Sequence, residues 1–343
     1  MKTITIYDIA KEADVSVATV SRVLNGTAPV KASTREKIMA LIDKHQFQPN
    51  ALARSLLKKE TGTIAMILPD ITNPFFPELF LGAENAAREK GYTFFLCNSA
   101  GEYNRESEYL SILREKRVDG IIFLGGRINL VSCPPELIQE VVELSKHVPI
   151  VLVNGNLPKG GLHRIYTDEG VGAAMAIQYL IDLGHRDIGF IGGMEGTTTT
   201  QSKLKAVKQT LKEHNLVLRK EWLKMGEYSI EGGRELMNEM LEQEHVPTAV
   251  LCVNDFTAIG AIKAAFEHGL RIPDDISIVG FDDSPLSTAV IPELTTVSQN
   301  TSELGKLAVE TLHEIINGNH PRKNKVLKPK LIVRKSTKQI KRK

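Results

Sequence analysis

Four side chains near the N-terminus have the types and spacing to read the edges of DNA bases. In D-V-S-V-A-T-V-S-R-V-L-N, residues 14–25, a helical period turns Val20, Val23 and Leu24 to one face. The opposite face carries Val17, Ala18, Ser21 and Arg22. Arginine donates two parallel hydrogen bonds to guanine, and small apolar groups contact the thymine methyl. The pattern predicts that DNA covers this face; an ordinary solvated surface or a protein-docking module are the alternatives.

A second polar set follows the apolar runs farther along the chain, where parallel strands are expected to end. Ligands of open α/β sheets bind beyond the carboxyl ends of the strands. Carboxylates and amides form forked hydrogen bonds with hydroxyl pairs, and a phenyl ring packs on the apolar face of a sugar. The set therefore predicts a carbohydrate-like effector; the alternative is that these residues cap the following helices, as we expect for Asp255. Its members are residues 70–76 with Phe75 and Phe76, then Asn154, Asn254, Asp255, Asp282 and Asp283.

These runs imply a parallel α/β body. They are near-continuously apolar, which is typical of strands covered on both faces, and amphipathic stretches separate them. Seven or more units of about thirty residues exceed one compact sheet, so we expect two doubly wound lobes. The expected strands are T-I-A-M-I-L, Y-T-F-F-L-C, D-G-I-I-F-L, P-I-V-L-V, D-I-G-F-I-G, T-A-V-L-C-V and D-I-S-I-V-G-F.

Three short helices are expected to position the first set in an all-α head. Thr5 with Asp8 forms an acidic variant of a capping box before an inward face of Ile6, Ile9, Ala10 and Ala13. Asp14 and Val15 form the turn, and Ser16 caps a helix over 17–24 that Asn25-Gly26 ends. Ser33 with Glu36 predicts a capping box for a third helix, with Ile38, Leu41 and Ile42 facing inward. Two helices joined by so short a turn form a helix-turn-helix, whose second helix enters the major groove.

A short segment, Q-P-N-A-L-A-R-S-L-L-K-K, follows the head. Asn50 begins about two helical turns, too few for a stable free helix in water. Arg54, Lys58 and Lys59 lie near Leu56, a residue type that wedges between base steps from the minor groove. The segment is predicted to fold on contact with DNA; a plain linker is the alternative.

Charge and composition are consistent with a nucleic-acid partner. Residues 1–60 hold ten Lys/Arg against six Asp/Glu, residues 320–343 hold eleven Lys/Arg and no acid, and residues 61–319 hold 22 against 35. An acidic body with a basic head suggests a polyanion at one end; for the basic C-terminus, a disordered tail is the alternative. No apolar run is long enough for a membrane span and no signal peptide is present, so we expect a cytoplasmic protein.

The sequence argues against an enzyme. It holds no phosphate-binding loop, no G-x-G-x-x-G after a strand, no H-E-x-x-H and no G-x-S-x-G. Cys97, Cys133 and Cys252 fit no metal spacing and are expected to be reduced thiols, while His185 is expected to be structural. We therefore expect no catalytic residue, no metal and no cofactor. A Rossmann-type enzyme and an exported sugar-binding protein remain as remote alternatives.

The chain resembles the LacI/GalR family of bacterial transcription regulators. T-I-Y-D-I-A-K-E-A-D-V-S-V-A-T-V-S-R-V-L-N-G, S-T-R-E-K-I and Q-P-N-A-L-A-R-S-L carry the likeness, and Asp14 departs from the usual glycine. The resemblance implies a periplasmic-binding-protein-like body. It implies a DNA-binding domain over 1–49, a hinge helix over 50–60 and an effector-binding and dimerisation domain over 61–343. Lobe 1 is expected at about 61–160 and 291–325, and lobe 2 at about 161–290 and 326–338.

The resemblance also assigns roles. It implies that Val17, Ala18 and Arg22 read bases and that Leu56 is the minor-groove wedge. The other residues expected at the DNA hold phosphates or fix the reading helix and the hinge: Thr5, Tyr7, Ser16, Thr19, Ser21, Asn25, Asn50, Ala53 and Arg54. Around the effector it implies Asn254 and Asp282, with Asn154, Phe75 and Phe76 beside them; Asp70 and Asn73 belong to the same expected site.

One departure bears on the effector. Sugar-responsive relatives carry an arginine where T-T-T-T-Q-S-K-L-K-A-V-K places Lys203, which lacks the planar fork of arginine. A phosphorylated metabolite or a protein co-effector therefore stays open beside a sugar or sugar derivative. The expected whole is a homodimeric repressor of a palindromic operator in double-stranded DNA, with no membrane partner. No leucine heptad follows Leu331, so no tetramer-forming helix is expected.

Overall fold

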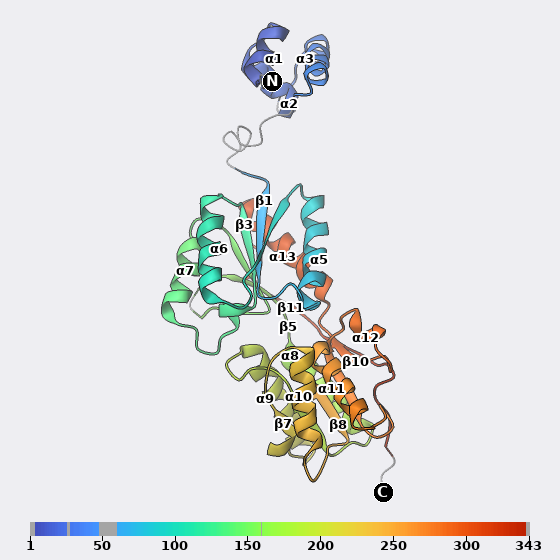
Figure 1. The fold of residues 1–343 in the computed structure, drawn as a ribbon. Coiled ribbons are helices and arrows are strands. Elements are labelled where there is room, and N and C mark those ends of the chain that lie inside the picture. The colour runs from blue at the N-terminus through green and yellow to red at the C-terminus, as the bar shows by residue number, and fades with distance from the viewer. Residues whose placement is uncertain (1–3, 26–27, 48–59, 159, 341–343) are drawn as a thin grey trace. The chain divides into compact units, whose positions relative to one another are not determined.

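The computed structural model describes residues 4–25, 28–47, 60–158 and 160–340, and the chain divides into two compact units, 1–61 and 62–343. The first unit is the predicted all-α head (Figure 1). It contains α1 (Ile6–Ala13), α2 (Val17–Asn25) and α3 (Ala32–His45). Ile9, Val20 and Ile38, one from each helix, are completely buried together. Such a core is enough to fix the turn between α1 and α2.

The predicted local signals of the first two head helices are confirmed. The Asp8 amide donates to the Thr5 hydroxyl, and the Thr5 amide donates to the Asp8 carboxylate at 2.9 Å, which is the capping box. Asp14 lies in the left-handed region with φ 57°, and the Ser16 hydroxyl accepts from the Thr19 amide at 3.2 Å. The third helix is present and Ile38, Leu41 and Ile42 face the head core as predicted, but the predicted capping box of Ser33 and Glu36 was wrong. α3 begins at Ala32 after Lys31, without a side-chain cap, so Ser33 already lies inside its first turn.

The second unit has two lobes, each built around a six-stranded sheet (Figure 1). The sheet of lobe 1 is parallel throughout, in the order β11-β5-β4-β3-β1-β2. The strands are β1 (Thr63–Leu68), β2 (Thr93–Asn98), β3 (Gly120–Leu124), β4 (Ile150–Val153), β5 (His163–Thr167) and β11 (Asn324–Leu327). Its other elements are α5 (Phe75–Glu89), α6 (Tyr103–Glu115), η1 (Gly126–Asn129), α7 (Pro135–Ser145) and α13 (Thr301–Ile316).

The sheet of lobe 2 has the order β12-β10-β9-β8-β6-β7, and β12 is its one antiparallel strand. The strands are β6 (Ile188–Ile191), β7 (Leu223–Lys224), β8 (Ala249–Cys252), β9 (Ser277–Asp282), β10 (Thr295–Ser298) and β12 (Lys330–Ile332). Its helices are α8 (Glu169–Asp182), α9 (Thr198–Glu213), η2 (Lys220–Trp222), α10 (Ile230–Leu241), α11 (Asp255–Glu267) and α12 (Leu286–Ala289). All seven strands expected from the sequence are present. β5, β7, β10, β11 and β12 are additional, and they are short or carry mixed polar residues.

The predicted lobe limits need correction. β5 pairs with β4 in lobe 1, although residues 161–290 were expected in lobe 2, and β10 pairs with β9 in lobe 2, although 291–325 were expected in lobe 1. β11 at 324–327 lies in lobe 1. The chain therefore crosses between the lobes after Thr167, after Ser298 and after Leu327. Strand pairing, which brings together segments far apart in the sequence, decides these limits.

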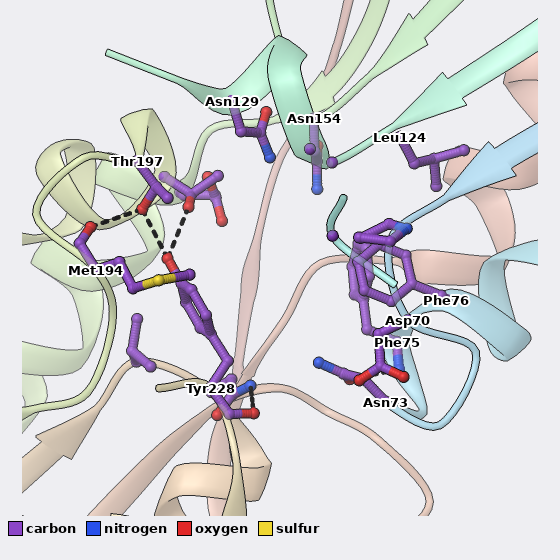
Figure 2. Close-up of a pocket in the computed structure, with 18 of the residues that line it drawn as sticks. Asp70, Asn73, Phe75, Phe76, Leu124, Asn129, Asn154, Met194, Thr197 and Tyr228 are labelled. Atoms are coloured by element: carbon purple, nitrogen blue, oxygen red, sulfur yellow. Dashed lines mark hydrogen bonds between the residues drawn. The ribbon is translucent and has the colours of Figure 1, made fainter. Parts of the chain in front are cut away.

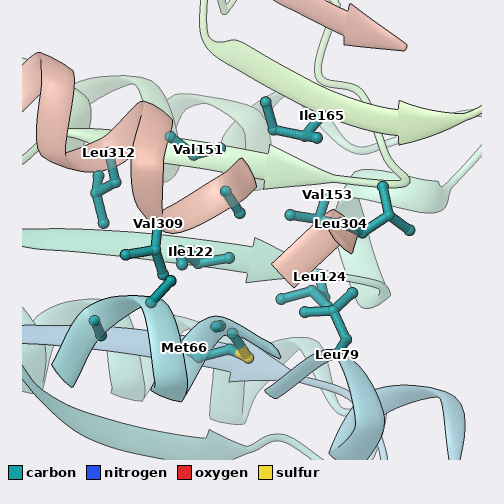
Figure 3. Close-up of a cluster of buried hydrophobic side chains, with 14 of the residues drawn as sticks. Met66, Leu79, Ile122, Leu124, Val151, Val153, Ile165, Leu304, Val309 and Leu312 are labelled. Carbon is teal, nitrogen blue, oxygen red and sulfur yellow. The ribbon is translucent and has the colours of Figure 1, made fainter. Parts of the chain in front are cut away.

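Helices cover both faces of each sheet. In lobe 1, α5 and α13 pack on one face and α6 and α7 on the other. Figure 3 shows Leu304, Val309 and Leu312 of α13 over the sheet residues Met66, Ile122 and Val151. The backbones of α5 and α13 approach closely at Gly305, where an added Cβ would lie only 2.1 Å from the Leu79 carbonyl oxygen. In lobe 2, α8 and α9 cover one face, and α10 and α11 cover the other.

The basic C-terminal segment is not a free tail as far as residue 340. The Arg334 guanidinium donates to the Asp283 carboxylate at 2.6 Å, and the completely buried Ser336 hydroxyl donates to the Ile278 carbonyl at 2.6 Å. His185 is buried, and its ring nitrogens bond the Thr248 hydroxyl and the Lys338 carbonyl. This confirms that the histidine is structural. In the described part of the chain, no helix is long and apolar enough to span a membrane.

Candidate functional site

A cavity of about 290 Å³ lies between the two lobes. It is lined by the carboxyl ends of strands from both sheets and the turns that follow them. Figure 2 shows Phe75, Phe76, Asp70 and Asn73 of lobe 1 on one side and Tyr228, Thr197 and Met194 of lobe 2 on the other. A volume of this size suits a ligand with about the bulk of a monosaccharide or a nucleobase. The rule for open α/β sheets thus locates the cavity correctly.

The structure brings all eight side chains expected around the effector to this lining. The phenyl rings of Phe75 and Phe76 stand edge to face, with centroids 5.2 Å apart. The Asp70 carboxylate accepts from the amide and hydroxyl of Thr72, which fixes the turn before α5. The eight are Asp70, Asn73, Phe75, Phe76, Asn154, Lys203, Asn254 and Asp282.

A chain of amide hydrogen bonds joins the lobes beside the cavity. Asn154, at the end of β4, donates to the Gln299 side-chain carbonyl at 2.8 Å, and Gln299 donates to Asp282 at 2.6 Å. The Asn154 side-chain oxygen accepts from the Thr167 main-chain amide, and the Thr167 hydroxyl donates to the main-chain carbonyl of Gln299. Both ends of the Asn154 amide are therefore used within the protein, at a residue whose φ is 47°. This residue shapes the site more than it offers hydrogen bonds to a ligand.

Lys203 is paired inside the protein. Its Nζ lies 2.7 Å from the Glu169 carboxylate and 4.1 Å from the centre of the Phe281 ring, with only 5% of the side chain exposed. Burial lowers the lysine pKa, but Glu169 and Asp282 outweigh it and raise the pKa above its ordinary value. Burial raises the pKa of Asp282 well above its usual range, although Lys203 acts in the opposite direction. The cavity thus holds one lysine against three carboxyl groups, those of Asp70, Glu169 and Asp282.

Tyr228 presents its ring to the cavity. Its hydroxyl lies 2.7 Å from the Thr197 hydroxyl (Figure 2). It also lies 2.6 Å from the Thr200 hydroxyl. The hydroxyl is thus occupied by lobe 2 itself. The aromatic face is what remains for a ligand.

The expected cap of α11 needs correction. Asn254, and not Asp255, caps this helix, because the Asn254 oxygen accepts from the Thr257 amide at 2.9 Å. Asp255 is buried, and it accepts from the Ser284 amide at 2.7 Å and the Thr296 hydroxyl at 2.6 Å. Burial raises the pKa of Asp255 to about 7. Asp283 lies outside the cavity lining and pairs with Arg334.

Several lining residues were not expected from the sequence. Gln299 follows β10, so the strand-end rule would have found it if T-T-V-S had been recognised as a strand. Glu169 lies in the first turn of α8 and Asn129 in a 3-10 turn, and neither position carries a sequence signal. The missed residues with a polar, aromatic or thioether side chain are Tyr103, Asn129, Glu169, Met194, Thr197, Thr199, Tyr228 and Gln299.

The head presents the expected face of α2. Ala18 and Arg22 are exposed, while Val17 is half-buried and packs partly on the head core. The Ser16 and Thr19 hydroxyls bond each other at 2.9 Å, Ser21 is half-buried, and Asn25 is the last residue of the helix. Tyr7 on α1 is 70% exposed, and Thr5 is tied into the capping box. Asn50, Ala53, Arg54 and Leu56 lie outside the described residues.

No cluster of metal-ligating side chains occurs in the described ranges. Cys97 and Cys252 are buried free thiols, and burial raises the pKa of each. Cys133 is partly exposed and also free.

Comparisons with known proteins agree with both units. Residues 5–50 match the model described as bacterial regulatory proteins, lacI family, and residues 177–337 match the periplasmic binding protein-like domain. Catabolite control protein A of Priestia megaterium is 38% identical over 92% of this chain and 93% of its own length. The HTH-type transcriptional repressor PurR of Aliivibrio salmonicida is 34% identical over 98% of this chain and 99% of its own.

A solved structure agrees over the same length. It is the lac repressor dimer bound to operator and the anti-inducer ONPF, with 27% sequence identity and a TM-score of 0.86. The likeness covers 98% of this chain and all of that one.

Proposed function

The chain belongs to the lacI family of bacterial regulatory proteins, and from this premise we propose that it is a repressor that binds a palindromic operator as a homodimer. An uncharged small molecule held between the lobes would control that binding. The chain is a transcription regulator and not an enzyme, as its relatives are. It would therefore act where the bacterial chromosome lies, in the cytoplasm.

The exposed face of α2 supports DNA binding. Val20 and Val23 are buried, which orients the helix and leaves Ala18 and Arg22 on its outer side. Arg22 would donate to guanine, and Ala18 with the outer part of Val17 would contact a thymine methyl. Tyr7 and Thr19 would contact phosphates beside them. A palindrome is expected because two copies related by a two-fold axis present two such helices.

Exposed apolar side chains on the body support a second copy as partner. Phe95 and Leu96 are 47% and 40% exposed on β2, the edge strand of lobe 1, and Leu81 is 59% exposed on α5, which packs against β2. In lobe 2, Phe266 and Ile291 are 80% and 94% exposed. Large apolar groups at such exposure mark interaction surfaces. The related lac repressor is a dimer, and we propose that these residues form the interface in a dimer of this chain.

The effector class follows from which charged and polar groups of the cavity lining are not already paired within the protein. Among the described residues, Lys203 is the one lysine in the lining and is paired with Glu169, and no arginine lines the cavity. A phosphorylated metabolite would meet the Asp70 carboxylate without a free cation in the described lining to offset the repulsion. The ring of Tyr228 faces the Phe75 and Phe76 side across the cavity (Figure 2). This arrangement favours an uncharged ring compound that carries hydroxyl or amide groups, and the pairing of Lys203 is the observation that carries the choice.

Selection of DNA from a random library tests the DNA-binding part of the proposal. The full chain should enrich a palindrome with a flexible pyrimidine–purine step, CpG by family resemblance, at its centre. Failure to enrich any sequence would remove the operator from the proposal. An Arg22→Ala chain, selected in parallel, should enrich the palindrome with base preference lost at one position per half-site.

A thermal-shift series tests the effector part. D-ribose and adenine represent uncharged rings, and ribose 5-phosphate and AMP are their phosphorylated counterparts. Because a ligand that binds only the folded protein raises the Tm, at least one uncharged probe should stabilise the chain more than its phosphorylated partner. Stronger stabilisation by the phosphorylated compounds would instead favour the phosphorylated metabolite.

A further inference from the structure

The edge of the lobe 1 sheet at which its strands begin carries a row of exposed basic side chains, here called the basic rim. In a parallel β-α unit the helix runs back against the direction of its strands, so its last turn lies at this edge. The connections that lead from the last two residues of α5, α6, α7 and α13 to the next strand meet there. The rim consists of Arg88, Lys90, Arg114, Lys116, Arg117, Lys146, Arg322 and Lys323, all of them exposed.

The corresponding edge of lobe 2 does not share this charge. In lobe 1 the four connections hold eight Lys/Arg against three Asp/Glu, whereas in lobe 2 the connections after α8, α9, α10 and α11 hold five against nine. The helix dipole favours basic side chains at the C-terminal end of any helix. Because the long helices of both lobes end at such an edge, the dipole predicts no difference between the lobes. It therefore does not account for the excess in lobe 1.

The protein itself does not neutralise the rim. Among the described residues, Lys146 is the one rim residue in an ion pair, 2.6 Å from Glu143, and both side chains of that pair are exposed. One of the three acids at this edge, Asp119, is already used by the main chain. It accepts from the Gly62 amide at 2.7 Å and from the Thr63 amide at 3.3 Å. Most of the positive charge is therefore available to an anion from outside.

The chain enters lobe 1 at the rim itself (Figure 1). The two hydrogen bonds to Asp119 fix the start of β1, and Asp119 follows Arg117 by two residues. Glu60 follows Phe47, the last described residue of the head, by thirteen residues. A chain of that length spans at most about 47 Å when fully extended. A head that binds DNA therefore brings the duplex within this range of the rim, which raises its effective concentration there.

We propose that the basic rim binds phosphates of the DNA that flanks the operator, and so adds a sequence-independent contact to the reading by α2. Lysine and arginine form charge-assisted hydrogen bonds with phosphate oxygens, and such contacts strengthen binding without reading the sequence. The inference rests on the proposed function, because it assumes an operator that the heads hold. It adds a DNA contact made by the body of the protein, outside the head.

The length of the duplex separates the rim from the reading helices. Two half-sites one helical turn apart occupy about 20 bp, so a duplex of about 20 bp that holds only the selected palindrome has no flanks. A duplex of about 60 bp with the palindrome at its centre has flanks on both sides. The first rim variant combines Arg114→Gln, Lys116→Gln and Arg117→Gln. Its affinity for each duplex is compared with that of the unmodified full chain between about 50 and 200 mM salt.

The long duplex should distinguish the two proteins and the short one should not. On the long duplex the unmodified chain should lose about 10³-fold more affinity over this salt range than the variant, because the variant lacks six phosphate contacts per dimer. A difference below about tenfold, which corresponds to fewer than two phosphates per dimer, would overturn the proposal. An equal difference on the short duplex would also overturn it, since no flanking DNA is present there.

A matched control in lobe 2 separates a contact from the net charge of the protein. Lys205→Gln, Lys208→Gln and Lys212→Gln together remove the same charge from exposed positions of α9, and none of the three lysines has an ion-pair partner among the described residues. This control should bind both duplexes as the unmodified chain does. If it changed the salt dependence as much as the rim variant, net charge would explain the effect and the rim would be dropped.

A second rim variant replaces the first if the first lowers the Tm of the free chain. It combines Lys90→Gln, Arg322→Gln and Lys323→Gln at the same edge and should give the same difference on the long duplex. Behaviour like that of the lobe 2 control would contradict the proposal. If selection from a random library yields no palindrome, the proposed function fails. The rim is then measured on a duplex of about 60 bp without a palindrome, where the same difference between variant and control is expected.

Discussion

The pairing of Lys203 with Glu169 decides which effectors the cavity can accept, and Lys203→Met tests it. Methionine keeps the length of the side chain and removes its charge. The Nζ lies 2.7 Å from the Glu169 carboxylate, and the two side chains are 5% and 11% exposed. Loss of one partner of so buried a pair leaves a carboxylate without compensation, which typically costs about 3–5 kcal/mol. Lys203→Met should therefore destabilise lobe 2 by about this amount.

Urea unfolding followed by tryptophan fluorescence measures the loss in the right place. Trp222 is the single tryptophan of the chain and is 1% exposed in lobe 2, so its emission reports the lobe that holds Lys203. The double variant Lys203→Met, Glu169→Met should recover most of the lost stability, because no unpaired charge remains.

A small effect would refute this reasoning. A decrease in the free energy of unfolding of less than about 1 kcal/mol, which is typical of an exposed ion pair, would mean that Lys203 is not held in a buried ion pair. The lysine would then be free to grip an anion, and a phosphorylated effector would become the better proposal.

Four further predictions follow from the head, the hinge and the buried acids. Arg22→Ala should cost about 1–3 kcal/mol on the selected palindrome and flatten base preference at one position per half-site, whereas Arg35→Ala on α3 should leave the preference unchanged. Raising the salt from 50 to 200 mM should weaken operator binding by about 10³–10⁵-fold if six to ten phosphates are contacted, as titration at several salt concentrations can check. Burial raises the pKa of Asp255 in the folded protein to about 7, from an ordinary 3.8. Its contribution to the free energy of unfolding, up to about 4 kcal/mol, is therefore present below pH 4 and lost as the pH rises through 7. Between pH 4 and pH 7 the Tm of Asp255→Asn should fall less than that of the unmodified chain. Leu56→Ala should weaken operator binding far more than non-specific binding, and amides of residues 51–58 should be slow in hydrogen exchange only on operator; protection without DNA would contradict a hinge that folds on binding.

The sequence determined the local structure and the places where ligands could bind. The capping box of Thr5 and Asp8, the left-handed Asp14 and the Ser16 cap depend on residues within a few positions of one another, so spacing alone predicts them. Buried parallel strands are apolar along their whole length, which made six of them readable and placed Asp70, Asn154 and Asp282 at strand ends. The seventh, β2, was also predicted because it is apolar, but it is an exposed edge strand. Short edge strands such as β7 and β11 lack that signal and were missed.

Only the tertiary structure decided which of these side chains remain available to a ligand. Asn154 donates to Gln299, and Lys203 is paired with Glu169. Asp255 is buried and accepts hydrogen bonds from Ser284 and Thr296, whereas Asn254 caps α11. The partners come from segments up to 145 residues apart, as Asn154 and Gln299 do. A hydrogen bond depends on distances of about 3 Å that sequence separation does not encode, so the chemistry of the cavity follows from strand order and from the crossovers.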